Sequence, residues 1–196
     1  MHDWLHIWLG IFENPEDTFH REKKKAKYSD ALMHYAVGGF AVGLLFLLST
    51  FLAKPPEGYE PLLLFGLPTV VNGVWLSVVR SSLIAIFLFF FIKLLDGKGA
   101  FVTHYYLLSL AVIPVSVADF FLDFLTGTPG MVLKLAFSGY KLFLLSVALK
   151  EAHEFEEHEA FFSWFVPLVL LLILAILVTQ VFSGGNALEF IEKYLV

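Results

Sequence analysis

Five ionisable side chains lie inside stretches of sequence that are otherwise apolar: Arg80, Asp119, Asp123, Lys134 and Lys141. A charged group at membrane depth is costly, so it faces protein or water and usually finds a partner. At about 1.5 Å of helix per residue, Arg80 and Asp119 reach similar depths in the outer half of the membrane. Asp119 and Asp123 are four residues apart and share one helix face. We expect an ion-paired cluster of Arg80, Asp119 and Lys134, with Asp123 nearer the surface.

Two uses of this charge cluster remain open. As a coupling-ion or proton site, it would belong to a small transporter or channel component. As a set of internal ion pairs, it would hold three helices together. The structural use is favoured, because the sequence shows no broken-helix pair or inverted repeat of the kind that transporters use.

A second group of candidate ligands lies in residues 153–158, with the sequence HEFEEH. The zinc-protease helix motif needs two histidines four residues apart, whereas these two are five apart. His153 with Glu157, and Glu154 with His158, do have the required spacing and make a candidate divalent-cation site. A solvated acidic helix beside the membrane is favoured instead. No cofactor and no catalytic residue is expected, since the chain has no cysteine and no Gly-rich phosphate loop.

The composition requires that membrane helices position these side chains. Hydrophobic residues make up 58% of the 196 residues and charged residues only 16%, with a mean hydropathy of +0.77. A soluble globule of this size cannot bury so much apolar surface. This excludes an ordinary soluble enzyme and a disordered chain. The net charge of −5, without a basic stripe, excludes a nucleic-acid partner.

The predicted fold class is all-α, a polytopic membrane bundle of five helices. Each helix needs about 20 apolar residues to cross the hydrocarbon core. Residues 31–182 form this transmembrane domain, with spans at about residues 31–53, 67–95, 100–125, 130–149 and 161–182. Polar breaks separate the spans, including a turn at 126–130 and a charged stretch at 150–159. A four-span alternative places residues 130–149 on or partly in the bilayer, because Lys134 and Lys141 interrupt them.

The distribution of basic residues predicts the orientation. Lysine and arginine accumulate in the cytoplasmic loops of membrane proteins. In the five-span arrangement one face carries eight of them and the other face two. We therefore expect a cytoplasmic N-terminus and a C-terminus outside the cell, with residues 183–196 as a short C-terminal tail.

Residues 1–30 are expected to form a cytoplasmic segment suited to a lipid surface. Trp4, Leu5, Trp8, Leu9 and Phe12 recur at helical spacing, as in an interfacial amphipathic helix anchored by its tryptophans. Packing of this stripe against the protein's own helices is an equal alternative. Asn14 and Pro15 then mark a new helix start. The basic run that follows comprises Arg21, Lys23, Lys24, Lys25 and Lys27. It is interpreted either as a site that attracts anionic head groups or as a topology determinant, and the second interpretation is favoured.

Several short motifs, taken in order, resemble the Yip-domain family of Ypt/Rab-interacting membrane proteins in its short prokaryotic form. They are Asn14–Phe19 before the first span, Asp96–Phe101 between the second and third, Ile113-Pro114, Leu149–His153, and Glu159-Ala160 before the last span. The resemblance covers about residues 15–182. The family is also five-spanning with a cytoplasmic N-terminus, which agrees with the charge count.

The resemblance implies a non-enzymatic helical bundle that organises membrane or recruits partners. The partners expected are the lipid bilayer and either a cytoplasmic protein or a second copy of the chain. Eukaryotic members are linked to vesicle traffic and to Rab-type GTPases, so such a GTPase is a partner by analogy only. The chain lacks their long cytoplasmic extension, which favours a prokaryotic plasma membrane as its location.

Overall fold

The computed structural model describes residues 4–53, 66–122, 124, 125 and 127–182. In this part of the chain every regular element is an α-helix: α1 (Trp4–Glu13), α2 (Pro15–Lys23), α3 (Tyr28–Ala53), α4 (Leu67–Leu94), α5 (Phe101–Leu122), α6 (Gly127–His153) and α7 (Glu157–Phe182). The last five of these are long and apolar enough to cross a membrane. The predicted all-α bundle with five spanning helices is therefore confirmed.

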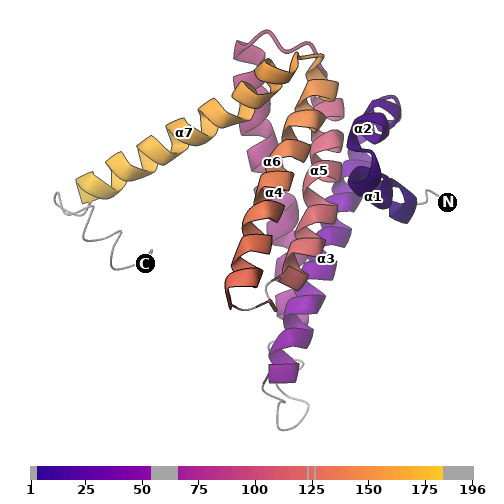
Figure 1. The fold of residues 1–196 in the computed structure, drawn as a ribbon, viewed down its shortest axis with the longest axis vertical. Helices are drawn as coiled ribbons and strands as arrows, with labels where there is room; N and C mark the ends of the chain where they lie inside the picture. The colour runs from indigo at the N-terminus through magenta and orange to yellow at the C-terminus, as the bar shows by residue number, and fades with distance from the viewer. Residues whose placement is uncertain (1–3, 54–65, 123, 126, 183–196) are drawn as a thin grey trace.

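Helices α3, α4, α5 and α6 run side by side, and α1 and α2 lie against one flank of this bundle (Figure 1). The closest approach is between α3 and α4. A Cβ atom at Gly39 would come within 2.6 Å of the carbonyl oxygen of Gly73, and one at Gly43 within 3.1 Å of the Cα of Val70. Small residues let membrane helices pack backbone to backbone. The glycines thus bring α3 and α4 into direct backbone contact.

Helix α5 is the centre of the molecule. Every residue from His104 to Ala111 is buried, because α3, α4, α6 and α2 surround this half of the helix. A helix that is apolar all round is stable only in such a buried position or in lipid. Polar groups on α5, such as His104 and Tyr106, are consequently held in fixed places deep in the bundle.

Helix α7 leaves the bundle, and its far end lies well apart from the other spanning helices (Figure 1). Near its start, Trp164 is buried and its indole N–H donates to the hydroxyl of Ser146 at 2.7 Å. From Leu168 to Val178 most of the large apolar side chains are exposed. Lipid is the solvent in which this exposure carries no hydrophobic cost.

The boundaries of the fourth and fifth spans differ from the predicted ones. Helix α6 begins at Gly127 and continues to His153, so it takes in most of the expected turn at 126–130. Only residues 154–156 separate it from α7, where a charged stretch over 150–159 was expected. The length of α6 favours five spans over four, since Lys134 and Lys141 do not interrupt it. The predicted tail at 183–196 lies outside the described residues.

Candidate functional site

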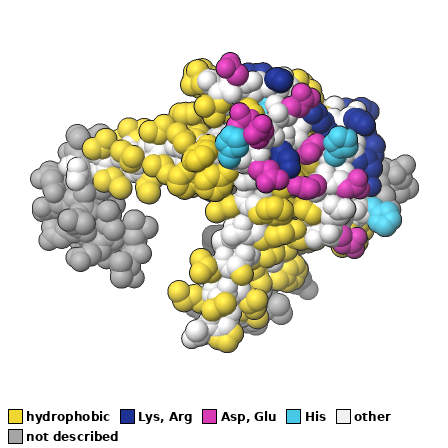
Figure 2. Space-filling view, turned by 45° about the horizontal axis from the view of Figure 1, so that its top comes forward, with side chains coloured by type: hydrophobic (Ala, Val, Ile, Leu, Met, Phe, Trp, Pro, Cys, Tyr) yellow, Lys and Arg dark blue, Asp and Glu magenta, His cyan; other side chains and the backbone are white. Residues whose placement is uncertain are grey.

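Charged side chains gather at one end of the bundle, which we call the polar end. It comprises α2, the turn at residues 95–100 between α4 and α5, and residues 150–159 around the turn from α6 to α7. Figure 2 shows acidic, basic and histidine side chains side by side on this end, whereas the rest of the visible surface is mostly apolar. A surface of this composition belongs in water, next to the membrane.

Helix α2 starts as the sequence predicts. The side chain of Asn14 accepts a hydrogen bond from the backbone N–H of Asp17 at 3.4 Å, and Pro15 occupies the first turn. Glu16 and Asp17 lie at the positive end of the helix dipole. The local sequence is therefore sufficient to stop α1 at Glu13 and to begin a second helix.

The buried carboxylate of Glu22 joins α2 to the centre of the bundle. This side chain is 1% exposed. It accepts from the Lys25 ammonium at 2.8 Å, from the Tyr106 hydroxyl at 3.1 Å and from the Arg21 guanidinium at 3.4 Å. Burial by itself disfavours the charged form, but the hydrogen bonds and charge of these partners outweigh it and hold the pKa of Glu22 below its usual value.

Exposed ion pairs connect α2 to α6 and to the turn that follows it. Lys23 contacts Glu154 at 3.1 Å, and His20 lies 3.1 Å from Glu151. Glu16 contacts Lys150 at 3.4 Å. Each exposed pair contributes little to stability. Together they fix the position of α2 over the end of α6.

These contacts divide the predicted basic run into two parts. Arg21, Lys23 and Lys25 are engaged by carboxylates of the protein itself. Lys24 and Lys27 are exposed and form no ion pair with any residue that the structure describes. Only the second pair is available to a lipid or a protein partner without breaking an internal contact.

Two buried histidines form a hydrogen-bonded pair beneath the polar end. The Nε2 atom of His104 lies 3.0 Å from the carbonyl oxygen of Ala85 and must donate to it. In the neutral ring, the Nδ1 atom of His104 is then an acceptor, so His153 donates to it from Nε2 at 2.9 Å. The remaining Nδ1 of His153 is a buried acceptor, and the described residues give it no hydrogen bond.

The turn between α4 and α5 packs directly on this pair. A Cβ atom at Gly99 would overlap the carbonyl oxygen of Ala152 and lie 2.9 Å from Nδ1 of His153. The Lys93 ammonium donates to the carbonyl oxygen of Gly97 at 2.7 Å and closes the turn. Glycine is needed here because no side chain fits between the turn and α6.

Helix α1 places its two tryptophans against the bundle. The indole N–H of Trp8 donates to Nδ1 of His34 at 3.2 Å, and the ring of Trp4 lies 5.2 Å from that of His34. Both rings are half-buried, and these contacts are those of the packing alternative. A lipid contact of the two tryptophans stays a prediction. Phe12 remains exposed, next to the ring of Tyr140.

The two leucines of the predicted stripe on α1 face outward. Leu5 is 71% exposed and Leu9 55%, while Ile7 and Ile11 are buried on the opposite side. Leu5, Leu9 and Phe12 follow helical spacing, so they form one face. The sequence analysis assigned the lipid-facing role to the tryptophans, whose size and polarity suit an interface. Leu5 and Leu9 are more exposed because the helix is rotated to place Trp4 and Trp8 against α3.

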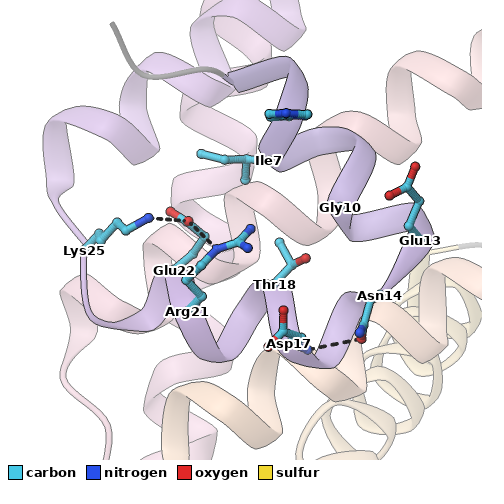
Figure 3. A pocket seen from close by; sticks show the side chains of 10 residues that line it. Ile7, Gly10, Glu13, Asn14, Asp17, Thr18, Arg21, Glu22 and Lys25 are labelled. Carbon is cyan, nitrogen blue, oxygen red and sulfur yellow. Dashed lines mark hydrogen bonds and ion pairs between the residues drawn. The ribbon is translucent and has the colours of Figure 1, made fainter.

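Between α1 and α2 the structure has an open cavity of about 470 Å³ (Figure 3). Its walls carry both signs of charge, with Glu13 and Asp17 on one side and Arg21 and Lys25 on another. The cavity floor includes Gly10 and Thr18. A zwitterionic or mixed polar group fits such a lining. Among the described residues no three His, Asp or Glu side chains are grouped to hold a metal ion.

The four residues predicted as a candidate divalent-cation site each contact a different partner. His153 is buried and pairs with His104, and Glu154 contacts Lys23. Glu157 contacts Lys150 at 3.3 Å, and His158 lies 3.5 Å from Glu156. The spacing of the four residues on an ideal helix does not apply, because α6 ends at His153 and the chain turns before Glu157.

The charges within the membrane are only partly brought together. Asp119 on α5 pairs with Lys141 on α6. Arg80 lies in a groove between α3, α4 and α5 and forms no ion pair with a described residue, so the expected contact of Arg80 with Asp119 is not made. Lys134 is half-buried on α6. Asp123, expected nearer the surface, lies outside the described residues.

Sequence reasoning missed the polar contacts beneath this end. Glu22 lies between Arg21 and Lys23 in the basic run. An acidic residue among basic ones is the one sequence feature that could have identified it. His104 and His153 are separated by 49 residues, so their pairing needs the packing of α5 on α6. Helix periodicity alone does not give that packing.

The fold and the polar end define an integral membrane protein with five candidate spans and an N-terminal helical pair fixed across one end. The family model described as the Yip1 domain matches residues 9–179, so the chain belongs to the Yip1 domain family. The match runs from α1 into α7 and includes every motif on which the resemblance was based. No curated protein and no solved structure gives a significant match.

Proposed function

We propose that this protein is a non-enzymatic membrane scaffold that recruits a protein partner at its polar end. The observation that carries this proposal is the fixed attachment of α1 and α2. Glu22 and Tyr106 join α2 to the central helix, and the exposed ion pairs hold α2 over α6. A preorganised surface binds with a smaller entropy cost than a mobile segment. The outward side of this surface offers Lys24 and Lys27 for recognition.

The polar end lies on the cytoplasmic side in this proposal. Its support is the gathering of basic residues there (Figure 2). Lys93 and Lys98 lie at and after the end of α4, and Lys150 contacts Glu16 of α2, near the basic run. Lysine-rich surfaces next to membrane helices mark the cytoplasmic face. Leu5 and Leu9 on α1 would then contact the adjoining lipid or the partner.

Site-specific photocrosslinking in native membranes tests the recruitment. A crosslinker at Lys24 is expected to give a discrete protein adduct, and Lys27→Glu in the same chain is expected to abolish it. The matched control is Leu135, which is exposed on the apolar surface of α6 and should give lipid adducts alone. Lipid adducts alone at Lys24 would contradict the proposal.

The alternative is a small transporter or channel component that uses the intramembrane charges. The pairing of Asp119 with Lys141 supports the structural use of these charges, because both are already neutralised by each other. Proton or ion flux through reconstituted liposomes, lost in Asp119→Asn while the fold survives, would favour transport.

A further inference from the structure

A groove of about 810 Å³ lies between α3, α4 and α5, within the spanning part of the bundle. Its α4 wall carries a polar stripe in an otherwise apolar helix: Thr69, Asn72, Ser77, Arg80 and Ser81. All five residues line the groove, so they lie on the side of α4 that faces it. Ser116 of α5 faces the same space.

Arg80 is the only charged residue of the groove wall that the structure describes. It lies near the middle of α4, about 20 Å of helix from either end, which is farther than an arginine side chain can reach. It is exposed and has no acidic partner among the described residues, since the carboxylate of Asp119 contacts Lys141. A guanidinium at this depth is costly unless an anion accompanies it.

The rest of the groove sets the class of that anion. Phe46, Leu76, Val112 and Phe120 give it apolar walls, and the stripe of hydroxyl and amide side chains leads from the start of α4 towards Arg80. A ligand that fits carries a compact anionic group, a few polar oxygens and long apolar chains. The bilayer supplies such molecules at high concentration.

We propose that this groove binds a phospholipid, with its phosphate on Arg80. The head group enters from the membrane surface at the start of α4, past Thr69 and Asn72. The guanidinium pairs with phosphate oxygens in the bidentate geometry that arginine favours. Ser77 and Ser116 donate to the remaining phosphate or ester oxygens. The acyl chains lie along the apolar walls of the groove and extend into the surrounding lipid. This site is separate from the polar end and does not depend on partner recruitment there.

Native mass spectrometry of the full chain, purified in detergent and supplied with phosphatidylglycerol, tests the site. One tightly retained lipid is expected per chain. Diacylglycerol with the same acyl chains lacks the phosphate and should not be retained. Arg80→Gln should weaken retention at least about tenfold, the loss expected for a charge-assisted hydrogen bond. Arg80→Lys should keep part of it.

A second variant removes space and keeps the charge. Ser116→Leu fills the α5 side of the groove and should weaken retention as Arg80→Gln does, even if the charge variant folds poorly. Lys98→Gln removes one exposed cation at the polar end and should leave retention unchanged. Displacement of the lipid by inorganic phosphate would overturn the proposal. So would retention by Arg80→Gln and Ser116→Leu that is as strong as retention by the unchanged protein.

Discussion

The hydroxyl of Tyr106 donates a hydrogen bond to the carboxylate of Glu22 at 3.1 Å, joining residues that are 84 positions apart in the sequence. Tyr106 lies on the buried half of α5, and Glu22 lies on α2, outside the spanning helices. The contact therefore connects the membrane core to the N-terminal helices. It makes α2 a part of the folded bundle.

Replacement of Glu22 by glutamine is expected to loosen α2. The neutral amide loses the charge that Lys25 and Arg21 stabilise, and the buried site keeps their unbalanced positive charge. The expected cost is about 1–3 kcal/mol, measured by thermal unfolding of the detergent-purified protein. Glu13→Gln, at an exposed position on the same cavity, is the control and should change the melting temperature little.

The attachment of α2 should also weaken in acid. Folding lowers the pKa of Glu22 from its ordinary value of 4.5, so its carboxylate stabilises the folded state above that value. This contribution is lost as pH falls below about 4.5 and approaches the folded-state pKa. The measurement is tryptophan fluorescence of a chain in which Trp75 and Trp164 are replaced by phenylalanine, so that the signal comes from Trp4 and Trp8 on α1. A shallower pH dependence in Glu22→Gln is expected, and an identical dependence would contradict the role assigned to Glu22.

Gly99→Ala is expected to destabilise the protein. Its methyl group would overlap the carbonyl oxygen of Ala152, so the turn must move away from α6. Overpacking of this kind costs about 1–3 kcal/mol. Gly139→Ala provides a matched control on α6, because a Cβ atom there meets nothing within 4 Å. That variant should be neutral or slightly more stable, as alanine favours helix.

The histidine pair predicts a distinct effect of His104→Phe. The ring volume is kept, but the Nε2–H of His153 loses its acceptor in a buried site. An unsatisfied buried donor costs about 1–3 kcal/mol. His158→Phe, at an exposed position, should have a much smaller effect on the melting temperature. Equal effects of the two changes would show that the hydrogen bond between the rings contributes nothing.

Asp119→Asn should destabilise the bundle by leaving the ammonium of Lys141 without its partner. Both side chains are about one-third exposed, at 36% and 33%, so the surrounding lipid makes an unpaired charge costly. The double variant Asp119→Asn with Lys141→Gln should recover part of the loss, and a double-mutant cycle measures the coupling. Purely additive effects would contradict the ion pair.

The two parts of the candidate site were accessible to sequence reasoning to different degrees. The start of α2 follows from Asn14 and Pro15, since capping depends on neighbouring residues alone. The rotation of α1 does not follow from its own sequence. Both Trp8 and Leu9 suit an interface, and only the position of His34 on α3 explains which of them turns inward.

Length and apolar composition were enough to predict the membrane-spanning helices, with an alternative left open only for the fourth, because a helix in lipid satisfies its own backbone hydrogen bonds whatever its neighbours are. The partner of each charge was decided by the tertiary structure. Counting residues gives the depth of Asp119 and Arg80, but the rotation of each helix about its axis decides what its side chains face. The packing of α5 on α6 brings Asp119 into an ion pair with Lys141. Arg80 instead faces the groove between α3, α4 and α5.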